Sequence, residues 1–431
     1  MTPEVKERIE QIRHGIVPEG YKKTGVGIIP HRWDLCALNS VMGNLEAGTS
    51  VNSDPSKDTG RYVLKTSAVF RGNVNLDEAK PVLETDIDRL KCPVQKGCIM
   101  ISRMNTPALV GECGYVKESS EVHFLPDRLG QATNISPETC DFVWLNQLLN
   151  YERYSSAIHS MATGTSNSMK NISKESFLGL TIACPSLVEQ QRISEILTTQ
   201  DKVIDQKTKL LAEKQRQKKY LTQQLLTGKK RLPGFDGEWR NVKLNEVLVE
   251  RKEKNANQDH RICSVAVQKG VVDQIEHLGR SYAAADTSNY GVAHYGDIIY
   301  TKSPTGDFPY GIIKQSQMNE EVAVSPLYGI YEPVCYEMGY LLHTYFSYAA
   351  NCSNYLLPII QKGAKNTINI TNDVFVSNKL YLPMEQGEQK ALAEIFITAD
   401  SEIELLRQSI EQEKQKKKAL MQLLLPGIVR V

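Results

Sequence analysis

Residues 218–228 read KKYLTQQLLTG, and residues 417–427 read KKALMQLLLPG. The two stretches lie 199 residues apart and are identical at seven of eleven positions. Both are rich in helix-forming residues, and both end at a glycine, which often terminates a helix. The phrase contains no nucleophile, no set of metal ligands and no phosphate loop. Its role must therefore depend on its place in the fold.

The repeat extends well beyond this phrase. Segments 33–41, 96–103 and 164–172 resemble segments 239–247, 295–302 and 363–370, in the same order. The matches continue as Pro185 with Pro383, Glu189-Gln190 with Glu388-Gln389, and Glu195-Ile196 with Glu394-Ile395. We infer that the chain consists of two diverged copies of one unit of roughly 200 residues.

Each copy combines a mixed domain with one long helix. Short β-rich runs separated by Gly, Pro, Asn and Ser, and followed by helical stretches, predict a compact α+β or α/β domain. The predicted divisions are an N-terminal helix with its lead-in loop, the first mixed domain, a central helical region with its linker, the second mixed domain and a C-terminal helical region: 1–30, 31–185, 186–235, 236–384 and 385–431.

The two long helices are predicted from uninterrupted stretches. No Gly or Pro occurs from Glu189 to Leu226, and the second stretch runs from about Glu388 to Leu425. A Ser186-x-x-Glu189 capping box precedes the first stretch, and Gly228 stands at the expected C-terminal cap. At 1.5 Å per residue, each helix would be roughly 55–60 Å long.

Apolar residues follow these helices in steps of four and three, which predicts a coiled coil. Separate packing of each helix on its own domain is the alternative, and the matched polar interruptions favour pairing. The short linker 229–235 makes the pairing antiparallel. The predicted coil and partner-docking residues are Ile193, Leu197, Ile204, Leu211, Leu221, Leu225, Leu392, Phe396, Ile403, Leu406, Ile410, Leu420 and Leu424.

Composition narrows the class of protein. The chain is 41% hydrophobic and 23% charged, which is typical of packed domains. It lacks an apolar run of about 18 residues, and its charged start does not look like a signal peptide. Nine scattered cysteines without a CxxC spacing predict reduced, buried thiols rather than zinc ligands or disulfides, and a cytoplasmic protein.

The sequence offers little support for catalysis. It contains no GxSxG, HExxH or GxxxxGK[ST], and Gly25-Val-Gly27 does not continue into a dinucleotide fingerprint. The Asn/Asp-Pro-Pro-aromatic tetrapeptide of amino-methyltransferases is absent, and the eight histidines are spread singly. We expect a protein with no catalytic residues and no metal ligands of its own.

Two recurring polar clusters point to nucleic acid. Residues 163–168 and 362–367 combine glycine, hydroxyl, amide and lysine groups, which can bind phosphates and base edges. Ordinary turns are the alternative for the clusters. Arg103 and Lys302, each after a strand, fit the same face but could equally form surface ion pairs. The predicted DNA-binding residues are Arg103, Thr165, Ser166, Asn167, Lys170, Lys302, Lys365, Asn366 and Thr367.

Charge is uneven although the net charge is only +1. Between Glu189 and Arg231, eleven Lys/Arg stand against five Asp/Glu, a net of +6. The basic run 214–219 recurs at 414–418, at the same place in both helices. Such runs are usually solvated faces, but these two could attract DNA phosphates or an acidic partner.

The complete order of these motifs resembles the specificity subunit of type I restriction–modification systems, and the resemblance covers nearly the whole chain. It rests on the Gly-Trp-like openings (Gly20 to Trp33, Gly234 to Trp239), the Gly-Cys/Asp-Ile strands, the Gly…Asn-Ile segments, the Pro…Glu-Gln pairs, the long helices and the closing phrase. Cys98 departs from the acidic residue that usually follows the glycine, and 165–170 carries an extra residue.

The resemblance implies two target recognition domains, each reading one half of a split, asymmetric site on double-stranded DNA. It implies that the helices dock two methyltransferase subunits, which bring S-adenosylmethionine and methylate adenine N6. Motor-nuclease subunits that use ATP and Mg²⁺ would complete the restriction enzyme. The phrase would then occur twice because two copies of one partner dock on one chain. A coiled-coil scaffold that binds no DNA is the alternative, and a self-sufficient methyltransferase is disfavoured by the absent motifs.

Overall fold

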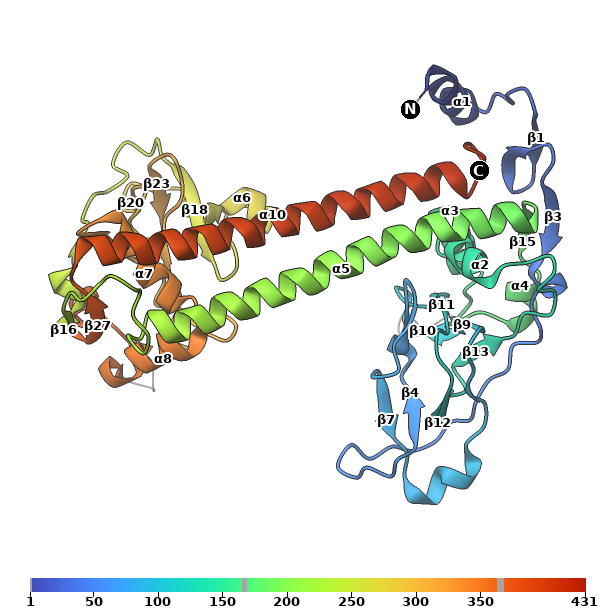
Figure 1. Cartoon of the computed structure of the whole chain (residues 1–431), viewed down its shortest axis with the longest axis horizontal. Helices are drawn as coiled ribbons and strands as arrows, with labels where there is room; N and C mark the ends of the chain where they lie inside the picture. Colours follow the sequence, from blue (N-terminus) through green and yellow to red (C-terminus); the bar gives the residue numbers. More distant parts are fainter. Residues whose placement is uncertain (1, 165–168, 363–367) are drawn as a thin grey trace. The chain divides into compact units, whose positions relative to one another are not determined.

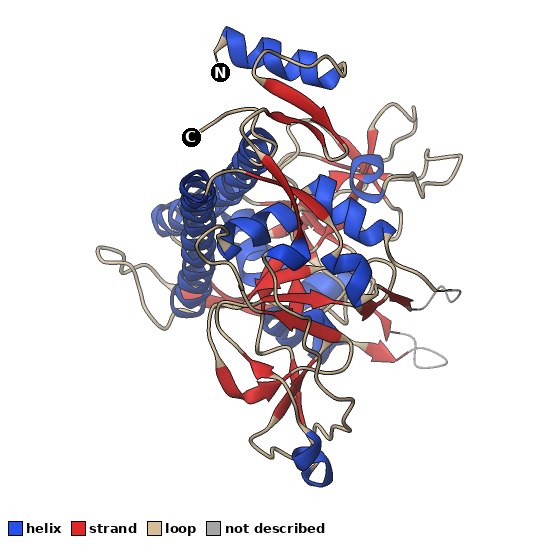
Figure 2. Cartoon of the chain, turned by 90° about the vertical axis from the view of Figure 1, so that its right-hand side faces the viewer, coloured by secondary structure: helices blue, strands red, loops and turns tan. Residues whose placement is uncertain are grey.

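The computed structural model describes residues 2–164, 169–362 and 368–431. Contacts group the chain into two compact units, and each is described by itself. The first unit comprises Met1–Lys207 and Ser409–Val431, and the second unit comprises Thr208–Gln408. Helices and short strands, drawn in blue and red in Figure 2, occur in both units by their residue ranges, so the predicted mixed α/β class with two repeated parts is confirmed. None of the helices in the described ranges is long and apolar enough to span a membrane.

The first unit contains a five-stranded and a four-stranded sheet. The first has the order β13-β9-β11-β6-β5, formed by Leu129–Ala132, Ile99–Ser102, Cys113–Tyr115, Gly72–Val74 and Val69–Phe70. The second has the order β7-β4-β12-β8, formed by Ala79–Pro81, Tyr62–Leu64, Ser120–Phe124 and Pro93–Val94. Strands β12 and β4 pair in parallel, and the other neighbours of β12 and β4 are antiparallel.

The second unit contains two four-stranded sheets of related layout. One has the order β17-β24-β21-β22, formed by Leu248–Glu250, Gly329–Pro333, Ile298–Tyr300 and Ile313–Gln315. The other has the order β19-β18-β23-β20, formed by Gly270–Asp273, Arg261–Ala266, Val322–Val324 and Gly291–Ala293. Strands β18 and β23 form a parallel pair, as β4 and β12 do in the first unit. The sequence repeat is thus also a repeat of strand pairing.

A two-stranded ladder closes each repeat. Strand β3 (Asp34–Ala37) pairs antiparallel with β15 (Thr181–Cys184), and β16 (Trp239–Lys243) pairs antiparallel with β27 (Lys379–Pro383). A short 3-10 turn follows β3 and β16 and buries Leu38 and Leu244 completely. The repeated Trp, Leu and Val positions are therefore core positions, which explains why they recur at fixed offsets.

The shorter helices are placed in corresponding order. The first unit contains α1 (Pro3–Arg13), α2 (Phe142–Leu149), α3 (Glu152–Ser160) and α4 (Lys174–Leu178). The second contains α6 (Gln274–Leu278), α7 (Tyr336–Phe346), α8 (Ala349–Leu356) and α9 (Asn372–Ser377). Side-chain caps open many of them, such as Asp141, whose carboxylate accepts from the Trp144 amide at 2.8 Å.

The long helices are α5 (Leu187–Leu225) and α10 (Gln386–Leu424), each of 39 residues (Figure 1). Gly228 and Gly427 follow them with φ of +70° and +72°, and their amides donate to Leu225 and Leu424. A Cβ atom at Gly228 would lie 2.8 Å from the Tyr381 ring, and one at Gly427 would lie 2.6 Å from Pro30. Glycine is required at both ends for its left-handed backbone and for this close approach.

The two long helices pack antiparallel within each unit. In the first unit, Asp201 pairs with Lys417 at 2.7 Å and Lys207 with Glu413 at 2.7 Å. In the second unit, Lys218 pairs with Asp400 at 2.5 Å. Residue numbers rise along α5 while they fall along α10, which fixes the antiparallel direction. The predicted pairing is confirmed, although the helix ends also pack on the rest of their units.

The buried carboxylate of Glu189 has a different role from the predicted one. Glu189 accepts from the Trp33 indole at 3.1 Å and from the Arg430 guanidinium at 2.6 Å (Nη2). It is therefore not the back-bonding member of a capping box, although Ser186 Oγ still accepts from the Glu189 amide at 3.4 Å. Burial favours these strong charged partners over a single backbone amide. We call Trp33, Glu189 and Arg430 the first latch.

The same arrangement recurs in the second unit. Glu388 accepts from the Trp239 indole at 2.9 Å, and from Nε and Nη2 of Arg231 at 2.7 Å each. We call Trp239, Glu388 and Arg231 the second latch. In each latch the glutamate opens one long helix, and the arginine follows the end of the other. The latches therefore tie the two helices together at their ends as well as along their length.

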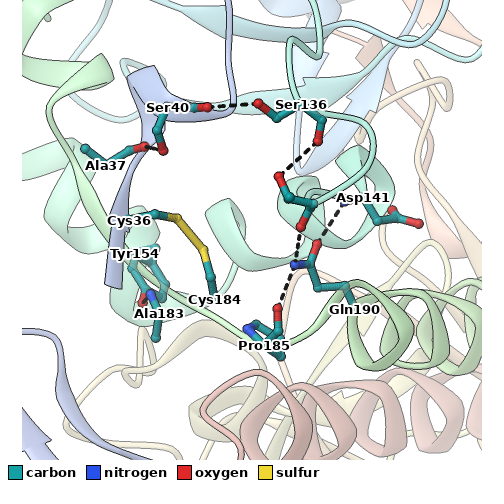
Figure 3. The surroundings of a disulfide bond; sticks show 11 residues. Cys36, Ala37, Ser40, Ser136, Asp141, Tyr154, Ala183, Cys184, Pro185 and Gln190 are labelled. Atoms are coloured by element: carbon teal, nitrogen blue, oxygen red, sulfur yellow. Dashed lines mark hydrogen bonds between the residues drawn. A yellow bond between two sulfur atoms is a disulfide. The ribbon is translucent and has the colours of Figure 1, made fainter. Parts of the chain in front are cut away.

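The glutamine after each latch glutamate contacts a neighbouring strand and helix cap. Gln190 donates from Nε2 to the Pro185 carbonyl at 2.9 Å, while its Oε1 accepts from the amide of Asp141, the cap of α2 (Figure 3). Gln389 likewise donates to the Pro383 carbonyl at 2.9 Å. The repeated Pro…Glu-Gln motif therefore joins a strand, a helix cap and a long helix in both copies.

The prediction of nine reduced thiols is wrong at two positions. Cys36 and Cys184 form a disulfide with a Cα–Cα separation of 6.6 Å (Figure 3). They are brought together because β3 and β15 pair with Cys36 opposite Ile182 and Asp34 opposite Cys184. Their separation of 148 residues gives no local sequence signal. The other cysteines are unbridged: Cys92, Cys98, Cys113, Cys140, Cys263, Cys335 and Cys352.

Candidate nucleic-acid interface

The two predicted polar clusters stand next to short strands in the chain. The first leads into β14 (Lys170–Asn171), which pairs antiparallel with β10 (Met104–Asn105). The second stands in the chain between β25 (Gln361–Lys362) and β26 (Ile368–Asn369), which also pair antiparallel. Six predicted DNA-binding residues lie outside the described residues: Thr165, Ser166, Asn167, Lys365, Asn366 and Thr367.

Arg103 and Lys170 lie close together in the first unit. Arg103 follows β9, accepts from the Ile172 amide at 2.9 Å and donates from Nε to the Ile172 carbonyl at 3.3 Å. Lys170 stands opposite Asn105 in the β10–β14 ladder. Their backbones therefore place two cations on neighbouring segments of the first unit. Arg103 is half-buried, and none of the ion pairs found in the described residues involves it.

An unsatisfied amide lies in the same ladder. Asn171 Oδ1 is buried without a hydrogen-bond partner in the described part of the chain. Buried amide oxygens are nearly always satisfied, so such an atom is a candidate ligand contact. The Asn-Ile pairs at 171–172 and 369–370 were visible in the repeat, but their sequence gave no reason to single out Asn171 over its neighbours.

Lys302 occupies a strained position in the second unit. Its φ is +59°, in the left-handed region that costs a non-glycine residue about 1 kcal/mol or more. Burial lowers the pKa of Lys302, and the nearby Glu250 carboxylate opposes that shift. Glu250 also accepts from the Asn372 amide at 2.5 Å, and Asn372 Oδ1 has no partner in the described ranges. Backbone strain at a partly buried lysine favours a binding role over that of an ordinary surface charge.

The basic runs of the long helices are largely used within the protein. Lys214 pairs with Glu402 at 2.7 Å, and the side chain of Lys218 is only 12% exposed in its pair with Asp400. In the other run, Lys417 pairs with Asp201. Because the helices are antiparallel, the two runs belong to different units, not to one level of the coil as their sequence positions had suggested. Interhelical pairing explains these three lysines without nucleic acid.

A large groove is present in the second unit. Its volume is about 1030 Å³, and it is bordered by the second-unit parts of α5 and α10, by α7 and by the turn between β18 and β19. The rings of Tyr295 and Tyr336 stack at a centroid distance of 5.3 Å on its wall. Its basic lining residues are Arg216, Lys218, Lys219, Lys269, Lys314, His343 and Arg407. Asp307, Asp400 and Glu404 also line the groove, so its basic residues outnumber the acidic ones. A concave surface with an excess of basic residues and with aromatic rings suits an anionic partner such as nucleic acid.

Lys314 is the most unusual cation of this groove. It is 5% exposed, and burial lowers its pKa to about 8. Its ammonium donates to Ser347 Oγ at 3.1 Å, and the neighbouring His343 Nδ1 accepts from the Gln315 amide at 3.1 Å. Burial, followed by the charges of Lys314 and Lys218, lowers the pKa of His343 well below its usual range.

The first unit lacks this lysine. Lys314 pairs with Ile299 in the second unit, and Gly114 pairs with Met100 at the corresponding register in the first. The two units therefore differ in charge at one matched core position. A lysine within the run Ile312–Gln315 carries no sequence signal, because only the tertiary fold shows that its side chain is buried.

The predicted coil residues fall into two groups. Eight are buried: Ile193, Leu197, Leu225, Leu392, Phe396, Ile403, Ile410 and Leu424. Five are half-buried: Ile204, Leu211, Leu221, Leu406 and Leu420. Ile193 and Leu197 belong to the core around Trp144, and Leu392 and Phe396 to the core around Trp239. A docking role for these residues stays a prediction.

Other apolar residues of the helices face solvent in the second unit. Leu210, Tyr220 and Leu405 are 46%, 53% and 65% exposed. They lie outside the predicted stripe, so the heptad pattern did not identify them. Large exposed apolar side chains on a helix pair are candidates for contact with a partner helix.

The chain is similar to known proteins in sequence. Residues 30–215 match the family described as "Type I restriction modification DNA specificity domain". The Type I restriction enzyme MjaVIII specificity subunit of Methanocaldococcus jannaschii is 26% identical over 220 residues, 51% of this chain and 51% of that subunit. That match spans about half the length of the relative. The putative MjaX specificity subunit of the same organism is 21% identical over 96% of this chain and 97% of its own length.

The fold is also found among solved structures. The crystal structure of a Type-I restriction-modification system S subunit from M. genitalium has a TM-score of 0.57, at 13% identity, over 91% of this chain and 96% of that chain. At this identity the likeness concerns the fold. The sequence and family matches confirm the resemblance that the repeated motifs indicated.

Proposed function

We propose that this chain is the sequence-specific DNA-recognition subunit of a type I restriction–modification complex, because residues 30–215 match the family of type I restriction–modification DNA specificity domains. The observation that carries the proposal is duplication: each unit repeats the closing ladder, the latch, and the start of one long helix packed against the end of the other. A chain built twice on one plan suits a site on DNA that is read as two halves.

Each mixed domain, 31–185 and 236–384, would read one half of a bipartite, asymmetric sequence on double-stranded DNA. Arg103, Lys170 and Lys302 would position the DNA through phosphates, together with the polar clusters 163–168 and 362–367. The difference at Lys314 and Gly114 supports unlike halves, since one unit offers a buried cation where the other offers none. The groove of the second unit would add contacts to its half-site.

The chain would be non-catalytic, and its chemistry would belong to other subunits. The helices would dock two methyltransferase subunits that carry S-adenosylmethionine and methylate adenine N6. Motor-nuclease restriction subunits that use ATP and Mg²⁺ would complete the assembly, and the complex would work in the cytoplasm. The exposed Leu210, Tyr220 and Leu405 support helix docking in the second unit. No observation favours the alternative of a scaffold that binds no DNA.

Methylation mapping tests the proposal directly. The chain is produced with its cognate methyltransferase subunit in a host without other adenine methylation, and modified adenines are mapped across the genome. We expect one split motif, methylated in both halves, that is absent without this chain. Mobility shifts with the purified complex and competitor DNA check binding. An active complex whose methylation or binding shows no sequence preference contradicts the proposed role.

A further inference from the structure

Two histidines and two glutamates come together at the ends of strands in the β19-β18-β23-β20 sheet. His260 precedes β18, Glu321 precedes β23, and His294 follows β20. Arg261 and Ala293 both pair with Val322, in parallel and antiparallel ladders, so these three residues reach the same edge. Glu253 joins them because its carbonyl accepts from the Val292 amide at 3.1 Å. The cluster is therefore positioned by backbone pairing, from segments far apart in sequence.

Three of these residues present ligand atoms to a common point. The ligand atoms of Glu253, His294 and Glu321 all lie within 4.8 Å of one another. His294 Nε2 lies 2.8 Å from a Glu253 oxygen and 3.8 Å from a Glu321 oxygen. Ligands on a tetrahedral zinc ion, with bonds of about 2.0–2.1 Å, are separated by roughly 3.3 Å. Small side-chain movements would bring the three atoms to this geometry.

His260 adds an independent indication of a cation. Its Nδ1 lies 2.9 Å from Oδ1 of the buried Asn255 and 2.9 Å from Oδ1 of Asp259. The Asn255 amide nitrogen donates to Thr287 Oγ1 at 3.3 Å, so both oxygens near His260 are acceptors and favour the proton on Nδ1. Nε2 then directs its lone pair at a Glu321 oxygen 3.3 Å away. Two acceptors at this distance need a shared proton or a metal ion, and a second hydrogen bond of this kind is typical of ligating histidines.

The charge of the cluster points the same way. Glu253 and Glu321 pair only with histidines, and no Lys or Arg within the described ranges forms an ion pair with either. The adjacent Glu320, by contrast, pairs with Arg261 at 3.1 Å. The side chains of Glu253 and Glu321 are 43% and 52% exposed, so an ion can reach them from solvent. Two carboxylates and two imidazoles are ligands that zinc and similar transition metals accept.

We propose that Glu253, His294 and Glu321, with His260 beside them, form a zinc-type divalent metal site in the second unit. The ion would link the segment that carries Glu253 to the ends of three strands. Binding would stabilise this unit because the ligands are assembled only in the folded chain. The site is independent of the DNA-recognition role and would be structural.

The test uses the full chain, stripped with a chelator and titrated with ZnCl₂ by calorimetry at pH 7.5. We expect one strong site per chain and a higher unfolding temperature of the second unit with zinc. His294→Ala and Glu321→Gln should each weaken that site about tenfold or more. The matched controls are His277→Ala, on exposed α6, and Glu320→Gln, and both should leave the affinity unchanged. Cobalt substitution should give a spectrum without a thiolate charge-transfer band, which separates this site from binding by cysteines.

Two results would overturn the proposal. One is the absence of a stoichiometric site in the stripped chain. The other is a site whose affinity is equal in His294→Ala and His277→Ala chains, or whose cobalt spectrum shows thiolate ligation. If zinc fails to bind while acidification alone stabilises the unit, the gap between His260 and Glu321 is bridged by a proton. DNA binding is measured separately, so neither proposal depends on the other.

Discussion

Arg430 and Glu189 form a charged pair inside the first unit, although 241 residues separate them in the chain. Arg430 lies three residues beyond Gly427, at the end of α10, and Glu189 lies in the first turn of α5. Arg231 and Glu388 repeat the relationship with the two helices exchanged. Each pair also stacks on a tryptophan, with Arg430 5.9 Å from the Trp33 ring and Arg231 5.6 Å from the Trp239 ring.

Removing a latch arginine should destabilise its own unit. Arg430→Ala leaves the Glu189 carboxylate, whose side chain is 4% exposed, without its cation, which costs about 3 kcal/mol. Glu189→Gln in the same chain should recover most of this loss. Scanning calorimetry should show a lower unfolding temperature for one transition only. Arg13→Ala, which breaks an exposed pair on α1, is the control and should change little. Equal losses of stability in Arg430→Ala and Arg13→Ala would contradict the stabilising role of Arg430.

Lys314 should make the stability of the second unit depend on pH. Its pKa is lowered to about 8 in the folded chain, against 10.5 ordinarily. Below pH 8 the lysine is protonated in both the folded and the unfolded chain, so the buried charge lowers the free energy of unfolding by its full amount. Between about 8 and 10.5 the folded state releases its proton first, and the cost falls.

Lys314→Met should therefore raise the free energy of unfolding at pH 7 by roughly 1–3 kcal/mol. The gain should shrink at pH 9.5, because the wild-type lysine is then mostly neutral. Urea denaturation at the two pH values measures the difference. Lys379→Met, at an exposed position of the same unit, should have an effect below about 0.5 kcal/mol at both values. A gain that does not change with pH would show that desolvation is not its source.

Lys302→Gly separates backbone strain from binding. Glycine adopts φ of +59° readily, so the substitution should stabilise the second unit by about 1 kcal/mol. The same change removes a cation from the proposed DNA surface and should weaken binding. Unfolding and mobility-shift measurements on one variant follow both effects. Lys302→Ala should weaken binding equally without the gain in stability. Unchanged DNA affinity in both variants would assign Lys302 a purely structural role.

Alanine at Asn167, Lys170, Lys365 or Asn366 should weaken DNA binding. A position that reads a base should cost about 1–3 kcal/mol and relax sequence preference there, whereas a phosphate contact should weaken all sequences alike and flatten the salt dependence. Binding is measured at several salt concentrations on matched and altered sites. Lys6→Ala, on exposed α1, is the control. If all four variants bind like the control, the polar clusters are ordinary turns.

The long helices should set the distance between the two half-sites. Seven residues preserve the apolar seam and add about 10 Å, close to three base-pair steps. Lys214 and Lys414 occupy matched positions in the sequence repeat, but Lys214 belongs to the second unit, where it pairs with Glu402, and Lys414 belongs to the first. Insertions after Thr208 and before Ser409 are therefore the matched pair. The methylated motif of this variant should keep both halves and gain a longer spacer. An active variant that keeps the original spacer would contradict the prediction that helix length sets the distance between the half-sites.

The sequence predicted what depends on periodicity and repetition. The long helices, their terminal glycines and their pairing follow from local propensity and an unbroken apolar seam. The latch arginines could also have been found, because extending the repeat three residues beyond Gly228 and Gly427 reaches Arg231 and Arg430. Glu189 was assigned to a capping box because its tertiary partners are distant in the chain. Lys314, the disulfide and the Glu253–His294–Glu321 cluster depend on strand register, which a single sequence does not specify.

The exchanged latches have a consequence for shorter versions of this chain. A half-chain ending after residue 235 would carry Glu189 without Arg430, and Arg231 without Glu388. Each half-chain would thus contain one arginine donor and one glutamate acceptor whose latch partners are missing from that half-chain. Two identical copies could satisfy both, with Arg231 of each meeting Glu189 of the other, because both members of the pair are offset by the same 199 residues. The duplicated chain can therefore be understood as a fused symmetric homodimer, in which fusion released the two halves to diverge.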